Sequence, residues 1–299
     1  MTDATKPASK EMALSADRLD FTSKLTGRDY RLFVSVPATP PPEGGFPVLY
    51  LIDGNLHFGI AVDTARIQGC WPDVVDPVVV GIGYQTDSVG QALELRMPDL
   101  TTPIAEDAQN WSWMKNMPPV RLGYGQMDRY LDMLETEIKP MIEARYPIDR
   151  GDQTLMGHSL GGLTTLNALF KRTASFQHYV AISASIWWND REVLKHEADF
   201  IARVKSGKAS ARALVSVGGL ESGDQRVQGS KMPMTAEQFA AMDADCRMVP
   251  NTVELGERLM AITGDNFEAM CVVHEGDDHN MVPPAGIARG IRFAFRRPE

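Results

Sequence analysis

Gln153-Thr-Leu-Met-Gly-His-Ser-Leu-Gly-Gly-Leu-Thr-Thr-Leu-Asn-Ala-Leu-Phe170 is the stretch that decides the fold of this chain. Its first part, residues 153–157, is a short apolar run typical of a strand, and residues 160–170 have the apolar spacing of a helix. Between them a Gly-x-Ser-x-Gly pattern predicts a sharp turn, because glycines at its two ends let strand and helix approach closely. We therefore expect Ser159 at a tight strand-to-helix turn.

A serine in this setting has a chemical use. Its hydroxyl projects at the carboxyl end of the sheet and at a helix N-terminus, where amide dipoles stabilise an oxyanion formed after nucleophilic attack. Ser159 is therefore our candidate nucleophile. The alternative is a serine that only caps the helix between two glycines.

The rest of the chain alternates between strand-like and helix-like segments. Several strand candidates are continuously apolar, as expected of parallel strands covered on both faces by helices. The predicted strands are Tyr30–Val36, Val48–Ile52, Pro77–Ile82, Gln153–Gly157, Tyr179–Ile182, Ala213–Val217 and Ala269–Val273. The predicted helices are Met127–Arg145, Leu160–Phe170, Glu192–Val204, Val253–Ile262 and Ala285–Phe295. This pattern predicts an α/β fold, a mostly parallel sheet with helices on both faces.

We expect a single domain over residues 21–299, preceded by a flexible lead-in over residues 1–20. Two stretches fit the alternation poorly, Thr101–Tyr124 with two tryptophans and a Pro-Pro pair, and Ser222–Pro250. Long irregular segments are often functional lids, so we expect both to cover the site.

Composition excludes several classes of function. The 299 residues are 43% hydrophobic and 23% charged, with a net charge of −9, which disfavours nucleic acid as a partner. No apolar run is long enough to cross a membrane, and the polar N-terminus lacks the pattern of a secretory signal. We therefore expect a cytoplasmic protein, with a periplasmic one as the alternative if a leader has been removed. Cys70, Cys246 and Cys271 are widely spaced, which predicts inert buried thiols and no metal site.

A serine nucleophile needs a base, and in α/β-hydrolases the chain order is serine, acid, histidine. His279, in Glu275-Gly-Asp-Asp-His279, follows the last predicted strand and is the best candidate. The acid should follow the preceding strand, where Glu221 is favoured over Asp224. A surface histidine in an acidic loop, and a Ser–His pair without an acid, are the alternatives.

The oxyanion needs two N–H donors. One is expected from Leu160, directly after the serine. The second is expected from the loop Asp53–Leu56 after an early strand, at Gly54 or Asn55, although Asp-Gly is also an ordinary turn signal.

The chain resembles the esterase D–like esterase family of α/β-hydrolases, and within it the trilactone siderophore esterases. The resemblance extends over residues 47–295, in the blocks Pro47–Asn55, Val79–Tyr84, Arg96–Thr101, Ile138–Tyr146, Gly157–Gly162, Ser183–Trp188 and Glu275–His279. It implies that Ser159 and His279 act with an acid near Glu221. It also implies that Arg96 lies beside the site and can meet anionic catecholate groups; a salt bridge to Asp99 or a neighbouring carboxylate is the alternative. Trp187 and Trp188 are expected to line the acyl pocket or to pack in the core.

These observations together predict a serine carboxylic-ester hydrolase that acts through an acyl-enzyme on a small-molecule ester. It should need no cofactor and no metal. A trilactone siderophore is one expected substrate. The alternatives are a short-chain acyl, feruloyl or acetyl esterase, a thioesterase, or a non-catalytic binding protein with this fold.

Overall fold

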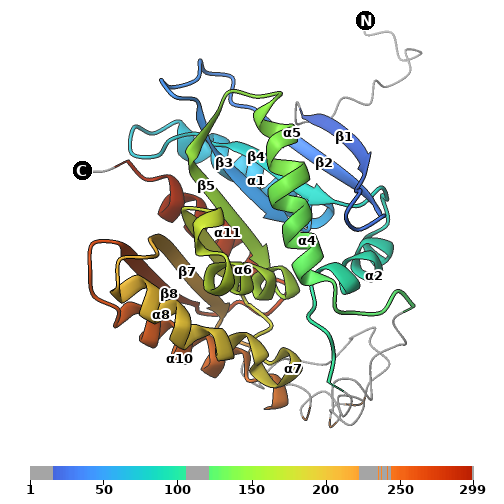
Figure 1. Cartoon of the computed structure of the whole chain (residues 1–299), viewed down its shortest axis with the longest axis vertical. Helices are drawn as coiled ribbons and strands as arrows, with labels where there is room; N and C mark the ends of the chain where they lie inside the picture. Colours follow the sequence, from blue (N-terminus) through green and yellow to red (C-terminus); the bar gives the residue numbers. More distant parts are fainter. Residues whose placement is uncertain are drawn as a thin grey trace, which may run out of the picture.

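The centre of the molecule is an eight-stranded sheet (Figure 1). The computed structural model describes residues 16–105, 121–221, 235, 237, 241 and 244–297. Its strands are β1 Asp17–Thr22, β2 Asp29–Ser35, β3 Phe46–Ile52, β4 Val78–Gly83, β5 Ile148–His158, β6 His178–Ile182, β7 Ala211–Gly218 and β8 Phe267–His274. They lie in the order β1-β2-β4-β3-β5-β6-β7-β8. The pairs β1–β2 and β2–β4 are antiparallel, and every later pair in this order is parallel.

Helices cover both faces of this sheet (Figure 1). They are α1 Gly54–Gly69, α2 Val89–Asp99, α4 Met127–Met133, α5 Lys139–Glu143, α6 Leu160–Lys171, α7 Trp188–Arg191, α8 Glu197–Lys205, α10 Met248–Met260 and α11 Val282–Phe295, with the short turns η2 Leu134–Ile138, η3 Thr173–Ser175 and η4 Glu192–His196. α1 and α11 pack together on one face, and α4, α6, α8 and α10 cover the other. The predicted fold class, a mostly parallel sheet between helices, is confirmed.

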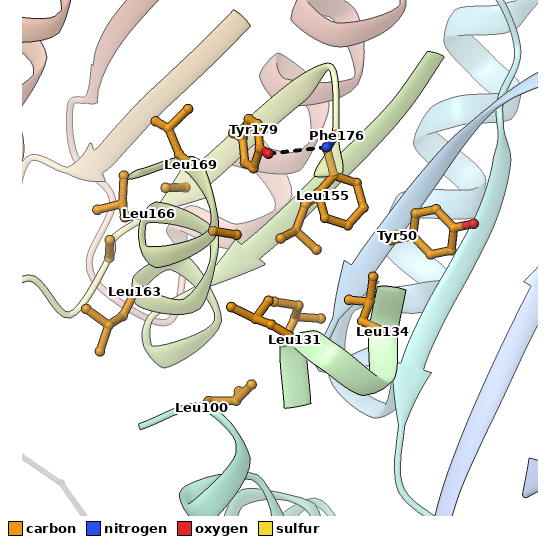
Figure 2. Close-up of a cluster of buried hydrophobic side chains, with 14 of the residues drawn as sticks. Tyr50, Leu100, Leu131, Leu134, Leu155, Leu163, Leu166, Leu169, Phe176 and Tyr179 are labelled. Atoms are coloured by element: carbon orange, nitrogen blue, oxygen red, sulfur yellow. Dashed lines mark hydrogen bonds between the residues drawn. The ribbon is translucent and has the colours of Figure 1, made fainter. Parts of the chain in front are cut away.

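Each face of the sheet has its own hydrophobic core. Figure 2 shows part of the larger one, where leucines of α4 and α6 meet Leu155 of β5 and Tyr50 of β3. All of β3 and β4 is buried, which agrees with their continuous apolar sequences. Burying one such leucine contributes about 1.5–3 kcal/mol, so this packing fixes the strand ends that carry the site.

All predicted strands and helices are present, although several boundaries differ. The predicted helix over 127–145 is divided into α4, the π-helical turn η2 and α5. Pro140 explains the division, because it has no N–H to donate to the carbonyl one turn earlier.

Three predictions about segments outside the predicted strands and helices need correction. The lead-in is shorter than 1–20, because residues 17–20 belong to β1, an edge strand with mostly exposed side chains. The predicted loop Asp53–Leu56 is instead the start of α1, a helix that together with α2 the sequence did not indicate. The predicted loop 222–250 is too long, because residues 248–250 already belong to α10. Most of it, and residues 106–120 of the other predicted lid, lie outside the described residues.

Candidate active site

Ser159 occupies a strained turn between the end of β5 and the start of α6. Its backbone has φ 60° and ψ −119°, a conformation that costs an L-residue about 1–3 kcal/mol. The Ser159 amide donates to the Ile182 carbonyl at 3.0 Å, and the Ser159 carbonyl accepts from the Ser185 amide at 3.1 Å. The end of β6 therefore holds the turn in a conformation that it would not adopt alone.

Gly157 makes this turn sterically possible. A Cβ atom on Gly157 would lie 2.3 Å from the carbonyl carbon and oxygen of Gly161, far inside van der Waals contact. The predicted strand, turn and helix are confirmed, with the glycines in the packing role expected of them. Ser159 is half-buried, and its hydroxyl lies 3.5 Å from the hydroxyl of Ser185.

Glu221 lies in a tight turn after β7 and is almost completely buried, with 1% of its surface exposed. Its Oε1 accepts hydrogen bonds from the Ser183 hydroxyl at 2.6 Å and from the Gly218 amide at 2.8 Å. Its Oε2 lies 2.6 Å from Nδ1 of His279. Each carboxylate oxygen thus has a partner, which is what a buried charge requires.

His279 follows β8 in a loop that is joined to the Glu221 turn, because the Leu220 amide donates to the Asp277 carbonyl at 3.0 Å. The side chain of His279 is 31% exposed, so one side of the ring is open. The other side contacts the ring of His158, the residue before Ser159, at a centroid distance of 4.5 Å. The structure thus brings Glu221 and His279 together beside the serine turn.

Asp224, the alternative acid, lies outside the described residues.

The three proposed oxyanion donors lie at two neighbouring helix N-termini. The first hydrogen bond of α1 runs from the Leu56 amide to the Asp53 carbonyl, and that of α6 from the Leu163 amide to the Ser159 carbonyl. The amides of Gly54, Asn55 and Leu160 precede them, in the part of a helix where N–H groups have no intrahelical acceptor. The two helix starts are adjacent, because a Cβ on Gly161 would lie 3.3 Å from Asp53 Oδ2.

Asn55 has a second task that the sequence did not show. Its side chain accepts from the Tyr84 amide at 2.7 Å and donates to the carbonyls of Tyr84 and Thr86. The side chain therefore ties the start of α1 to the loop after β4. Only the main chain of Asn55 is left as a donor to substrate.

Arg96 forms a buried ion pair, and its partner is Asp53. Its Nε and Nη2 donate to the two Asp53 oxygens at 2.9 and 2.7 Å, and Nη2 also reaches the His158 carbonyl at 3.3 Å. Arg96 is only 7% exposed. The expected salt bridge is present, but with Asp53 and not Asp99, which instead binds Arg28, Tyr30 and Tyr84. Because the Arg96 guanidinium is buried and bound to Asp53, this arrangement argues against a direct contact of Arg96 with substrate.

The two tryptophans differ. Trp188 is 1% exposed and packs in the core with Tyr124, so it is a packing residue and its assignment to the substrate pocket is corrected. Trp187 is half-buried and packs against the small cluster of Val217, Cys246 and Met248. Its contact with substrate stays a prediction.

Several residues at the site were missed or set aside. His57 and His158 were passed over because they precede Ser159 in the chain, yet the ring of His158 contacts that of His279, and the ring of His57 contacts that of His158. Ser183 and Ser185 belong to a quoted sequence block, but nothing in the block indicated their contacts. Adjacency to Ser159 was the only available signal for His158.

The structure also bears on metals, thiols and membranes. In the described ranges no group of histidine, cysteine or acidic side chains is arranged to hold a metal ion. The prediction of buried cysteines is right for Cys246 and wrong for Cys70, which is exposed, while Cys271 is half-buried. Of the helices that can be described, none is long and apolar enough to span a bilayer. The cytoplasmic location stays a prediction.

The fold and these residues define a class of protein. A strained serine turn follows a central parallel strand, and a glutamate and a histidine follow the next-to-last and last strands. That combination identifies an α/β-hydrolase. The family model described as "Putative esterase" matches residues 23–241, and the chain belongs to this family. It is a carboxylic-ester hydrolase of the serine type.

The chain is similar to esterases of known name. It is 33% identical to the ferri-bacillibactin esterase BesA of Bacillus subtilis, over 92% of this chain and 87% of the relative. It is 31% identical to the siderophore triacetylfusarinine C esterase of Aspergillus fumigatus, over 98% and 95% of the two chains. Among solved structures, the BES protein of Bacillus cereus superposes with a TM-score of 0.79 at 29% identity, over 99% of this chain and 100% of that one.

Proposed function

We propose that this enzyme hydrolyses the ester bonds of a trilactone siderophore, with Ser159 as nucleophile, His279 as general base and Glu221 as the acid that orients it. The observation that carries the catalytic part is the 2.6 Å contact between His279 Nδ1 and Glu221 Oε2 beside the strained serine turn. The substrate part is supported by the relatives, which are named as esterases of bacillibactin and triacetylfusarinine C.

Acylation would begin with attack of Ser159 Oγ on an ester carbonyl of the substrate. His279 Nε2 takes the serine proton, while the hydrogen bond from Nδ1 to Glu221 stabilises the imidazolium that forms. The oxyanion of the tetrahedral intermediate accepts hydrogen bonds from the Leu160 amide and from that of Asn55 or Gly54. Collapse of this intermediate breaks the ester C–O bond, and His279 gives its proton to the leaving alkoxide.

Deacylation repeats these steps with water. His279 removes a proton from a water molecule, which attacks the carbonyl carbon of the acyl-enzyme. The second tetrahedral intermediate then releases the carboxylic acid, and the proton returns to Ser159. The sequence consumes one water per ester bond and needs no redox partner.

The substrate proposal is tested with purified protein and two kinds of ester. We expect enterobactin, a catecholate trilactone, to be opened to its linear trimer and shorter products, detected by liquid chromatography and mass spectrometry. p-Nitrophenyl butyrate is the comparison ester, and its kcat/KM should be lower. A trilactone that stays intact while p-nitrophenyl butyrate turns over would leave a short-chain esterase and refute the siderophore assignment.

The catalytic proposal is tested with Ser159→Ala and a fluorophosphonate probe. The unmodified protein should be labelled at Ser159, and the variant should lose labelling and turnover of both esters. Circular dichroism shows whether the variant is folded. Labelling or turnover that survives in folded Ser159→Ala would refute the assignment of the nucleophile.

A further inference from the structure

Three histidine rings from different elements stand in a row beside the serine turn. His57 comes from α1, His158 from the end of β5, and His279 from the loop after β8. The rings of His158 and His279 have centroids 4.5 Å apart and planes inclined by 39°. On the other side, His57 meets His158 edge-on, at 5.5 Å and 88°.

The hydrogen bond to Glu221 does not by itself fix the direction of the His279 ring. It holds one ring atom, Nδ1, at 2.6 Å from Oε2, and leaves rotation of the ring about that contact open. A base must direct Nε2 at the serine, so this rotation matters for catalysis. The His158 ring supplies a second constraint from a different direction, because it lies against the His279 ring in a tilted contact.

His158 is itself held from several sides. Its backbone is paired with Ile182 in the sheet, and its carbonyl accepts the bond from Arg96 Nη2. Its Nε2 is buried and has no hydrogen-bond partner among the described residues. The ring is therefore placed by the strand, by packing and by a hydrogen bond with the His279 backbone, so it is fixed independently of the contact between the two rings.

The surroundings keep the His158 ring neutral. Burial is the main cause that lowers its pKa well below the usual value, and the nearby His279, His57 and Arg96 lower it further. A hydrogen bond with the His279 backbone acts in the opposite direction. Burial also lowers the pKa of His57, although the charge of Asp53 opposes this. A neutral ring beside His279 does not repel the imidazolium that catalysis creates there.

We infer that His158 is a positioning residue for His279: its ring forms a neutral, flat support that prevents the imidazole from rotating about its bond to Glu221. This inference rests on the proposed function, in which His279 is the base. It assigns no proton transfer to His158. The support acts on the chemical step and not on substrate binding.

The test compares His158→Ala, which removes the flat support, with His158→Phe, which keeps a flat face without a titratable group. We expect the alanine variant to lose about 10- to 100-fold in kcat on p-nitrophenyl butyrate, as for a small misplacement of a catalytic group. Its KM should change little. The phenylalanine variant should recover most of the lost kcat, which a requirement for a histidine proton would not allow.

Titration of active sites distinguishes a variant that folds poorly from one whose base is misplaced. Each kcat is divided by the fraction of enzyme that a fluorophosphonate labels, so that only competent protein is compared. His178→Ala is the matched control, because His178 lies at the start of β6 and pairs with Asp152 at 3.1 Å, outside the site. It should keep the kcat of the unmodified enzyme.

Two results would overturn the inference. One is a kcat of His158→Ala equal to that of the unmodified enzyme, and the other is an equal loss in the alanine and phenylalanine variants. A failure of the proposed function looks different, since Ser159→Ala would then retain turnover. If Ser159→Ala is inactive and His158→Ala is fully active, only the role of His158 is wrong.

Discussion

Ser183 Oγ donates a 2.6 Å hydrogen bond to Glu221 Oε1, the oxygen that does not face His279. The Gly218 amide donates to the same oxygen at 2.8 Å. Both Ser183 and Glu221 are buried, so water does not replace these donors when they are lost. The orientation of Glu221 is thus determined by the end of β7 and by the turn after β6, and not by the histidine alone.

Replacing Ser183 by alanine should therefore reduce activity. The change removes a donor to a buried carboxylate, an interaction worth about 1.5–3 kcal/mol, so we expect kcat/KM on p-nitrophenyl butyrate to fall about 10- to 100-fold. Ser183 has φ 43°, and alanine has the same Cβ, so backbone strain is unchanged. Ser206→Ala, at an exposed serine, is the control and should have no effect. Full activity in Ser183→Ala would show that Gly218 alone suffices.

Glu221→Gln tests the acid itself. Glutamine is nearly isosteric, but its amide group offers an N–H to His279 Nδ1 and so favours the wrong tautomer of the base. In a serine protease with the same kind of triad, replacing the acid by its amide lowers kcat by about 10⁴-fold. We expect a loss of about 10³- to 10⁴-fold with little change in KM, measured by initial rates. A loss below about tenfold would favour a Ser–His pair that works without an acid.

Gly157→Ala tests the packing of the serine turn. The new Cβ would lie 2.3 Å from Gly161 atoms, so we expect a loss of about 3 kcal/mol or more in the free energy of unfolding, together with loss of activity. Gly90→Ala is the matched control, since the nearest atom to its Cβ would be Ser88 Oγ at 4.0 Å. Urea unfolding of both variants checks the difference. Equal stability of the two would contradict the steric argument.

Much of the fold could be predicted because buried strands have a recognisable local sequence pattern. β3 and β4 are buried on both faces, and their sequences are accordingly continuous apolar runs. β1 was not predicted, because it is a short edge strand with mostly exposed side chains, and its apolar alternation consists of only Leu19 and Phe21. α1 was missed for a related reason. It contains three glycines and mixes apolar with polar residues, so it has a weak helical pattern.

The residues of the site likewise fall into those that the sequence could predict and those that it could not. Ser159 is marked by its own neighbours in sequence, and His279 and Glu221 by their positions after strands, so their placement could be predicted from topology. The partner of Arg96 could not, because Asp53 lies 43 residues earlier and only the packing of α2 against α1 brings them together. The row from His57 to His279 likewise joins three distant parts of the chain. Pairings between such distant segments leave no local pattern.

Asp53→Asn tests the buried ion pair with Arg96. Asparagine tolerates the left-handed conformation of residue 53, φ 60° and ψ 45°, so the change mainly removes the charge. It leaves the Arg96 guanidinium buried without its counterion, which costs about 3–5 kcal/mol in the free energy of unfolding. Urea unfolding followed by circular dichroism measures it. The double variant with Arg96→Met should recover part of the loss, and a single-variant loss below about 1 kcal/mol would refute the prediction.

His57→Gln should change how stability depends on pH. Burial, the largest cause, lowers the pKa of His57 in the native protein, whereas the unfolded chain keeps a value near 6.5. Below about pH 6.5 the unfolded state therefore binds a proton that native His57 does not, and the free energy of unfolding falls as pH decreases. One such group contributes a slope of up to about 1.4 kcal/mol per pH unit. Glutamine does not titrate, so the variant should lose less stability on acidification.

The pH dependence of the free energy of unfolding must be compared between the unmodified protein and His57→Gln, because other titrating groups change that free energy in the opposite direction. Burial raises the pKa of Asp76 to about 6, so native Asp76 binds its proton before the unfolded chain does and adds stability as pH falls. That contribution is common to both proteins and cancels in their difference. Between about pH 7 and pH 5, urea unfolding should then show that the free energy of unfolding falls more steeply in the unmodified protein than in His57→Gln as pH decreases. An equal pH dependence of the free energy of unfolding in the two proteins would mean that His57 binds its proton equally in the folded and unfolded states. It would refute the argument that burial of the ring disfavours its charged form.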